Sequence, residues 1–445
     1  MSDAPTVAVI GGGATGLTAA YRLGQRGYDI HLYEAGAELG GLVRTFEVGG
    51  EPIECFYHHL FTSDSAAKRL FEELGVSDRI EWHESRVGTF RDGRIFPFTT
   101  ALDLLRFSPI GIRDRVKLGL TSMQLGRMSD GSQFEETTAA EWLRREVGTQ
   151  ATGVIWEPLL RGKFGAMWDK VVMTWLWNKL KTRFSSRTRL WQREMLGYMR
   201  GSFGAWTERI VARLRELDCG IETGARVDRI VSEGGLVGIE LGGRTTHFDA
   251  VIATVSNSVF ERIAPDLTDG YAAKLRGTPY QDVVCLTLVL DRPLTDYYWL
   301  NIADAEVPFV AVIEHTNLVD AERYGGRHIV YVPSYVDRDS SALETLDETL
   351  ASYLPHLQRI NAAFDQSWIV KKHLFRARDA QPVFTAGAGD RIPHHRTPVP
   401  GLYLANMAQI YPQDRGQNYA IERGEAVADM VAEDLARGSV RSYRV

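Results

Sequence analysis

Apolar positions near the start of the chain change their spacing twice. Residues 6–10 form a short β-branched run, residues 14–26 repeat apolar side chains at helical spacing, and residues 28–34 form a second strand-like run. A glycine-rich turn, Gly11–Gly16, joins the first run to the helical stretch. This order predicts one βαβ unit of a parallel sheet.

Helical spacing dominates from about residue 65 to residue 200, with one hairpin-like interruption at residues 86–98. Residues 201–256 then predict a helix, a strand, a meander with Gly-Gly turns, and a buried strand that returns the chain to the first sheet. Later segments predict strands at 283–290, 307–314 and 328–333, a helix near 341–357, a buried strand at 401–407 and a helix at 419–436.

The length of the chain favours two domains, because 445 residues is about three times a typical domain of ~150 residues. We predict an α/β fold in which a Rossmann-type nucleotide-binding domain is interleaved with an α+β substrate domain. The nucleotide-binding domain is expected to comprise residues 1–64, 201–270 and 385–445, and the substrate domain residues 65–200 and 271–384.

Charge and cysteine content limit the partners. A formal net charge of −6 gives no general attraction to nucleic acid, and we expect none to bind. The N-terminal apolar run breaks at glycines, and no run approaches the ~20 apolar residues that span a bilayer, so a cytoplasmic location is expected. Three separated cysteines without a CxxC pair, and the isolated pair His394 and His395, indicate neither a disulfide framework nor a metal site.

The glycine turn matches the G-x-G-x-x-G pattern of dinucleotide-binding sites, directly after a strand and before a helix. Gly13 would let the backbone approach a pyrophosphate, and the helix N-terminus would stabilise its charge. Glu34 ends the next strand, where a carboxylate accepts hydrogen bonds from an adenosine ribose. The site residues of the turn are Gly11, Gly13, Ala14, Thr15 and Gly16.

The segment after the second strand resembles a family signature. Residues 34–45, EAGAELGGLVRT, resemble the E-A-x-x-x-x-G-G-x-x-x-T signature of the flavin amine oxidase superfamily, which includes protoporphyrinogen oxidases and phytoene desaturases. The resemblance implies bound FAD, with a glycine pair close to its pyrophosphate and Arg44 offering charged donors. Leu42 stands where many relatives have arginine. The site residues implied by this segment are Glu34, Ala35, Gly40, Gly41, Leu42 and Arg44.

Two later segments carry the same resemblance. Val227 matches the family's valine whose backbone contacts adenine. Residues 401–407 and 416–424 resemble the last FAD-binding segment, in which a strand and a glycine turn lead into a helix that points its N-terminus at the flavin. Asn406 replaces the Asp or Glu that relatives often place after this strand, and its amide can still hydrogen-bond. The site residues implied here are Asn406, Gly416, Asn418, Tyr419 and Ala420.

The resemblance implies an enzyme with non-covalent FAD, since no cysteine lies in a segment resembling the usual attachment site. The leading expectation is an oxidase, desaturase or dehydrogenase that transfers hydride from a substrate C–H bond to flavin N5. A non-redox mutase of the UDP-galactopyranose mutase type and a non-catalytic binder with the fold of Rab GDP-dissociation inhibitors are the alternatives. The substrate is expected to be a small molecule, hydrophobic or sugar-linked.

Two adjacent histidines follow the flavin loop. His58 and His59 lie in the segment ECFYHHLFT (54–62), which looks like the segment Y-G-P-H-I-F-H-T of UDP-galactopyranose mutases. One of them could adjust flavin protonation or contact the substrate, since histidine titrates near neutral pH. A strand with one inward and one outward histidine accounts for the pattern equally well.

Three further segments carry charged or aromatic candidates. Residues 156–165 predict a helix end followed by a compact turn, in which Lys163, with Glu157 and Arg161, could clamp an acidic or sugar-phosphate substrate. A capped, solvated turn is favoured for any one of these charges. The aromatic and basic stripe at 171–184 suits a substrate tunnel or a peripheral membrane contact, and more often forms a core with a basic edge. Arg376 and Arg378 lie in a segment resembling the A-x-P segment of protoporphyrinogen oxidase-like proteins, where either could approach the flavin or an anionic substrate. A solvent-exposed loop accounts for them equally well.

Overall fold

The computed structural model describes residues 4–185, 194–233, 235–338 and 345–438. The predicted βαβ unit forms the middle of a five-stranded parallel sheet, which is fully buried at its centre because Val7, Ala8 and Val9 have no exposed surface. The order of this sheet is β10 (Gly220–Thr223), β2 (Asp29–Glu34), β1 (Thr6–Ile10), β14 (Ala250–Ala253) and β20 (Leu402–Leu404).

Helices cover one face of the parallel sheet and a small meander covers the other. On one face pack α1 (Ala14–Gly24), α9 (Gly204–Glu216) and α14 (Gln417–Ala436), with α2 (Ser65–Glu73) against α14. The other face carries the predicted meander, β11 (Arg229–Glu233), β12 (Leu236–Leu241) and β13 (Arg244–Phe248), with α10 (Asn257–Ile263) and α11 (Asp269–Arg276). This is a Rossmann-type arrangement, as the sequence predicts.

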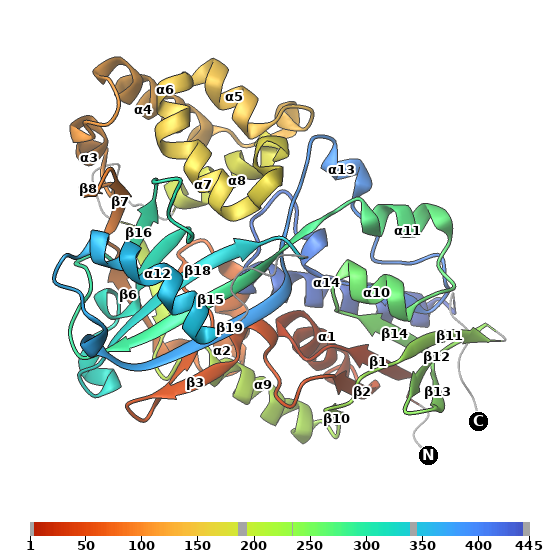
Figure 1. Cartoon of the computed structure of the whole chain (residues 1–445). Helices are drawn as coiled ribbons and strands as arrows, with labels where there is room; N and C mark the ends of the chain where they lie inside the picture. Colours follow the sequence, from red (N-terminus) through yellow and green to blue (C-terminus); the bar gives the residue numbers. More distant parts are fainter. Residues whose placement is uncertain (1–3, 186–193, 234, 339–344, 439–445) are drawn as a thin grey trace.

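A second, seven-stranded mixed sheet lies beside the parallel sheet (Figure 1). Its order is β19 (Ile369–Pro382), β15 (Tyr280–Leu290), β18 (His328–Val336), β17 (Ala311–Glu314), β16 (Trp299–Ile302), β7 (Val87–Arg91) and β8 (Arg94–Pro97). β7 and β8 form the hairpin predicted at residues 86–98. The helix α12 (Leu346–Ile360) packs on this sheet.

A lobe of helices with its own apolar core extends from the seven-stranded sheet (Figure 1). Its members are α3 (Ala101–Arg106), α4 (Ile112–Arg127), α5 (Ala139–Glu146), α6 (Thr149–Ala151), α7 (Glu157–Phe164) and α8 (Met173–Ser185). Trp175 and Trp177 of α8 are buried in this core. The two tryptophans of the stripe at 171–184 are therefore core, which is the interpretation that the sequence favours.

The sequence did not predict a small three-stranded sheet whose buried residues share the core of the parallel sheet. Its strands are β5 (Leu60–Phe61), β9 (Met195–Met199) and β6 (Ile80–Glu84). Ahead of it lies a hairpin of β3 (Thr45–Val48) and β4 (Glu51–Glu54). Among the residues described, no helix is both long and apolar enough to cross a membrane.

Candidate functional site

The glycine turn is tight at one end and open at the other. Gly11 has a φ of +108°, and its N–H donates to the carbonyl of Tyr33 at 2.8 Å. A Cβ at position 16 would lie 1.9 Å from the Gly11 carbonyl oxygen, so only glycine lets α1 approach β1 this closely. A Cβ at position 13 would meet no atom within 4 Å. Space for a ligand therefore lies beside Gly13.

The N-terminus of α1 opens onto this space. No side chain caps α1, and its first turn holds no acidic residue, so the N–H groups of Ala14 and Thr15 are available to an anion. The glycine pair lies on the other side: the N–H of Gly40 donates to the Gly12 carbonyl at 2.8 Å, and Gly41 packs against Gly13. These residues fit a dinucleotide pyrophosphate.

Glu34 joins the segments expected around the adenosine. Its two carboxylate oxygens accept from the N–H groups of Gly12 and Gly36, both at 2.7 Å. The N–H of Ala225 donates to the Glu34 carbonyl at 2.9 Å, which brings the segment of buried Val227 beside the end of β2. Ala35 is exposed at this edge.

The side chains of Leu42 and Arg44, which follow the glycine pair, differ in their exposure. Leu42 is half-buried and packs against the core of the parallel sheet. Arg44 is exposed, and its Nε donates to the Gly41 carbonyl at 3.0 Å. Arg44 thus lies at the mouth of the pyrophosphate space, where a charged donor can reach a phosphate.

The last helix brings a second uncapped N-terminus toward this region. α14 packs on α1 through Gly424, where a Cβ would lie 2.6 Å from the Thr15 carbonyl oxygen. Gly416 precedes α14 without a side-chain cap, and no acidic residue lies in the first turn, which contains Tyr419 and Ala420. The positive end of the helix dipole is therefore open to a flavin, as the resemblance implies.

The two amide side chains predicted at this end are engaged inside the protein. The Nδ2 of Asn406 donates to the Val255 carbonyl at 2.8 Å and to the Oδ1 of Asn257 at 2.9 Å. The Oδ1 of Asn418 accepts from the N–H of Ala67 at 3.1 Å. By contrast, the Nε2 of Gln417 is buried without a hydrogen-bond partner among the described residues. Sequence reasoning passed over Gln417, although it stands at the first position of the helix.

His58 and His59 are half-buried and uncharged near neutral pH. The Nδ1 of His58 hydrogen-bonds the Phe56 carbonyl at 2.7 Å, and the Nδ1 of His59 hydrogen-bonds the hydroxyl of Tyr298 at 3.0 Å. Burial lowers the pKa of His58 to about 4 and the pKa of His59 to about 3. Trp299 contacts the ring of His59 edge to face. Both histidines can pack and hydrogen-bond, but neither carries a proton to donate as an imidazolium.

Asp414, one position before Arg415 and two before Gly416, is the centre of a cationic cluster. Its carboxylate accepts from the Nζ of Lys163 at 2.7 Å and from the Nζ of Lys179. Arg415 follows directly, and its Nη2 donates to the hydroxyl of Tyr335 at 3.1 Å. Asp414 is the only carboxylate shown pairing with these lysines in the described part of the chain. The Asp414 cluster, namely Lys163, Lys179, Arg415 and Asp414, therefore has excess positive charge.

Burial and the neighbouring charges shift the pKa values of the side chains in this cluster. Burial lowers the pKa of Lys179 to about 8 and lowers the pKa of Lys163 as well, against the attraction of Asp414. Burial alone would raise the pKa of Asp414, but the two lysines hold it well below its usual range. An anion bound here would relieve the repulsion among the cations.

Only Lys163 of the three charges predicted at 156–165 enters the cluster. The compact turn predicted within residues 156–165 is wrong, because Glu157–Phe164 form α7. Lys163 faces Asp414, while Arg161 pairs with Glu157 at 2.8 Å on the exposed side. Arg378 lies in strand β19 rather than in a loop, and it is exposed. The cluster members missed from the sequence are Lys179, Asp414 and Arg415.

Glu54, the first residue of the histidine segment, is a buried carboxyl group that holds the end of β4 against its neighbours. It accepts from the hydroxyl of Tyr198 at 2.8 Å and from the N–H of Phe203 at 2.5 Å. Burial raises the pKa of Glu54 to about 7.

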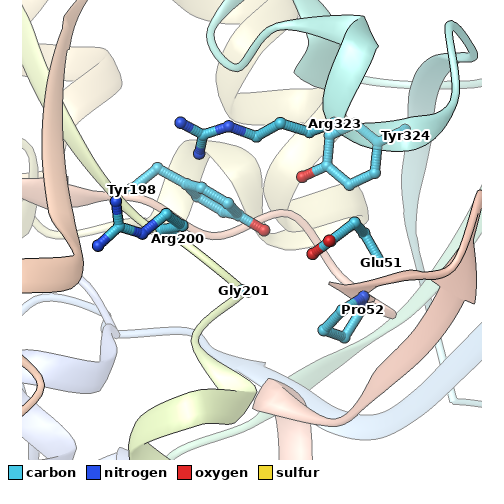
Figure 2. A pocket seen from close by; sticks show the side chains of 7 residues that line it. All are labelled: Glu51, Pro52, Tyr198, Arg200, Gly201, Arg323 and Tyr324. Carbon is cyan, nitrogen blue, oxygen red and sulfur yellow. The ribbon is translucent and has the colours of Figure 1, made fainter.

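Tyr198 also lines a cavity of about 150 Å³ with Glu51, Pro52, Arg200, Gly201, Arg323 and Tyr324 (Figure 2). Arg323 pairs there with Glu81 at 2.5 Å, and Glu51 adds a second carboxylate, so this cavity has less excess positive charge than the Asp414 cluster.

Glu54→Gln is expected to stabilise the protein above about pH 7 and to flatten its pH dependence. Between pH ~4.3, the pKa in the unfolded chain, and the native pKa of about 7, the folded state binds more protons, so the free energy of unfolding falls as pH rises. The glutamine removes this loss, which is on the order of 3–4 kcal/mol at about pH 8. Urea unfolding at about pH 5 and about pH 8 measures it. The exposed control Glu51→Gln should keep the wild-type slope, and an unchanged slope in Glu54→Gln would contradict the prediction.

The parallel sheet, the two open helix N-termini and the glycine pair together define a flavin-dependent oxidoreductase class. The family of flavin-containing amine oxidoreductases matches residues 14–432, and the chain belongs to this family. The resemblance inferred from residues 34–45 and from the C-terminal segment is thereby confirmed.

Individual relatives agree with this family. A coproporphyrinogen III oxidase of Mycobacterium tuberculosis is 28% identical over 164 residues, which is 35% of this chain and 36% of that relative's length. A 15-cis-phytoene desaturase of an Oncidium hybrid cultivar is 23% identical over 465 residues, or 96% of this chain and 78% of the relative.

Solved structures share the fold over nearly the whole chain. Cyclohexylamine oxidase from Brevibacterium oxydans matches with a TM-score of 0.75, covering 98% of this chain and 100% of that one at 16% identity. Reduced UDP-galactopyranose mutase matches with a TM-score of 0.73, covering 96% of each chain at 17% identity. At these identities the likeness concerns the fold alone.

Proposed function

We propose that the protein is an FAD-dependent oxidoreductase with non-covalently bound FAD, which removes hydride from a C–H bond of a small anionic substrate. The Asp414 cluster carries this proposal. Three cations around one largely buried carboxylate are costly to hold together unless a further anion neutralises them. A carboxylate or phosphate group of the substrate would supply that anion, and the cations of the cluster would orient this group.

Each part of the chain has a separate task in this proposal. The amide groups at the start of α1 bind the pyrophosphate, and the positive end of α14 stabilises charge at the flavin's pyrimidine edge. A bound flavin supplies the hydride acceptor. Lys163 and Arg415 hold the anionic group of the substrate, while uncharged His58 and His59 shape the space next to them and limit water.

Anion probes test the proposal before a substrate is known. Phosphate, citrate and uridine monophosphate, added separately to the oxidised flavoprotein, should perturb the flavin absorption spectrum with saturable binding. Lys163→Met should weaken the binding of the tightest-binding probe by roughly tenfold, because one charge-assisted contact is lost. Binding should also weaken above about pH 8, because Lys179 then loses its proton.

Arg161→Met is the matched control, since Arg161 is on the same helix but pairs with Glu157 on the exposed side. It should bind every probe as the wild type does. If no probe binds, or if both substitutions act alike, the cluster does not bind substrate and the anionic substrate class is wrong.

A sugar mutase is the second candidate. Trp299 favours it: this half-buried indole lies against Tyr57 and His59 and offers an aromatic surface to a nucleotide base. Anaerobic photoreduction followed by air separates the two candidates. Flavin that reoxidises within seconds supports an oxidase. Flavin that stays reduced, together with conversion of UDP-galactopyranose only in the reduced protein, would replace the oxidoreductase proposal by the mutase.

A further inference from the structure

Exposed apolar side chains gather at one place on the helical lobe. Of the eight large apolar residues exposed in the described part of the chain, five lie between residues 102 and 120. They are Leu102 and Leu105 of α3, and Ile112, Val116 and Leu120 of α4, each between 46% and 63% exposed. Single exposed apolar residues need no explanation, but a contiguous group on adjoining helices indicates an interaction surface.

The apolar stripe of α4 faces away from the core of the lobe. Ile112, Val116 and Leu120 follow one another every four residues and so share one side of the helix. Leu118 and Leu125, on the opposite side, are buried against α8, whose Trp177 donates from Nε1 to the Leu125 carbonyl at 3.1 Å. The exposed stripe is therefore on a different side of α4 from the residues that pack in the core of the lobe.

The two helices hold this surface in a fixed arrangement. Arg115 of α4 donates from Nη1 to the Leu105 carbonyl at 2.6 Å and from Nε to the Ile110 carbonyl at 2.7 Å. These bonds tie the end of α3 to the start of α4. α3 and α4 lie next to each other at the edge of the molecule (Figure 1). We call the exposed residues of these two helices the outer face.

The charge of the outer face is opposite to that of the whole protein. Residues 101–127 contain five basic and two acidic side chains, although the chain carries a net charge of −6. Of the two acids, Asp103 is used to cap α3. The exposed basic residues beside the apolar stripe are Arg106, Arg113, Lys117 and Arg127.

We propose that the outer face binds the surface of an anionic lipid bilayer. An apolar stripe flanked by exposed basic residues is the composition of an interfacial helix, whose apolar face enters the acyl boundary while its cations meet acidic headgroups. A second copy of the chain fits less well, because a two-fold contact would place basic residues opposite basic residues. This inference uses no residue of the Asp414 cluster and stands independently of the proposed reaction.

Vesicle sedimentation with the flavin-loaded protein tests the inference. Vesicles of phosphatidylcholine with about one third phosphatidylglycerol should bind the protein, and pure phosphatidylcholine vesicles should bind it far less. Val116→Ser/Leu120→Ser should lower partitioning on the order of tenfold, because two apolar side chains no longer enter the bilayer. Arg113→Gln/Lys117→Gln should lower it by a similar factor and weaken its dependence on salt.

Leu217→Ser/Val370→Ser is the control, since both residues are exposed elsewhere, on the turn after α9 and on β19. It should partition as the wild type does, and all variants should keep their flavin and unfolding midpoint. Absence of binding to anionic vesicles, or equal binding by Val116→Ser/Leu120→Ser, would overturn the proposal. A concentration-dependent dimer that only this variant loses would assign the outer face to a second copy instead.

Discussion

Gly13→Asp should abolish flavin retention while leaving the folded protein at least as stable as the wild-type protein without flavin. Gly13 is the N-cap of α1, with φ −81° and ψ −177°, a conformation open to any residue. Its Cβ position meets no atom within 4 Å. Aspartate is a favoured N-cap and interacts well with a helix dipole, which adds roughly 0.5 kcal/mol to folding. The same carboxylate would fill the space of the pyrophosphate and repel it.

Because flavin retention should be lost while the stability of the flavin-free protein should not fall, the loss of flavin cannot be attributed to unfolding. Flavin absorbance of the purified variant measures retention, and urea unfolding of both flavin-free proteins measures stability. Gly270→Asp is the matched control, because Gly270 is exposed near the start of α11 and its Cβ also meets nothing within 4 Å. It should stay yellow. A yellow Gly13→Asp protein would refute the assignment of the pyrophosphate space, and an unfolded one would refute the open geometry at Gly13.

The nucleotide site could be predicted because its information is local. Gly13, Gly16 and the pair Gly40 and Gly41 lie within 45 residues. Gly16 is required by the close approach of α1 to β1, and Gly40 and Gly41 by their positive φ angles, while Gly13 leaves open space for the ligand. Spacing between glycines, strand and helix is therefore visible in the sequence itself. The five-stranded sheet and the meander followed from apolar spacing for the same reason.

The Asp414 cluster could not be predicted in the same way. Lys163 and Lys179 reach Asp414 across 251 and 235 residues, from two helices of a lobe whose packing has no short-range signature. Asp414 and Arg415 stand in a loop next to the predicted flavin helix, and this position was the one available signal. The small sheet of β5, β9 and β6 was missed because strand pairing between distant segments leaves no trace in spacing.

The turn predicted at residues 156–165 fails for a definite physical reason. Pro158 and Gly162 suggest a turn, but residues 149–164 form one continuous helical segment of α6, a π-helical stretch (Thr152–Trp156) and α7. The π-helical stretch directly precedes Pro158, which has no N–H to donate to the preceding turn. Gly162 is used for packing, since a Cβ there would lie 3.1 Å from the Cβ of Val310. Both residues thus serve a helix, and only Gly165, with φ +53°, ends it.

Asp414→Asn is expected to destabilise the protein by about 3 kcal/mol, the cost of leaving largely buried charges without their counterion. Asparagine keeps the size and some hydrogen bonds of the side chain but removes the charge that Lys163 and Lys179 share. Urea unfolding near pH 7 measures the loss. Asp347→Asn, which breaks an exposed pair with Lys372, should cost under ~0.5 kcal/mol and serves as the control.

The second arm of this experiment connects stability to the proposed substrate class. If repulsion among the cations is the cause, Asp414→Asn/Lys179→Met should recover a large part of the lost stability, since one of the opposing charges is gone. The anion probe that binds the wild type best should likewise stabilise Asp414→Asn more than wild type, because it takes the place of the missing carboxylate. A double variant as unstable as Asp414→Asn would show that Asp414 acts through packing, and the electrostatic account of the cluster would then be wrong.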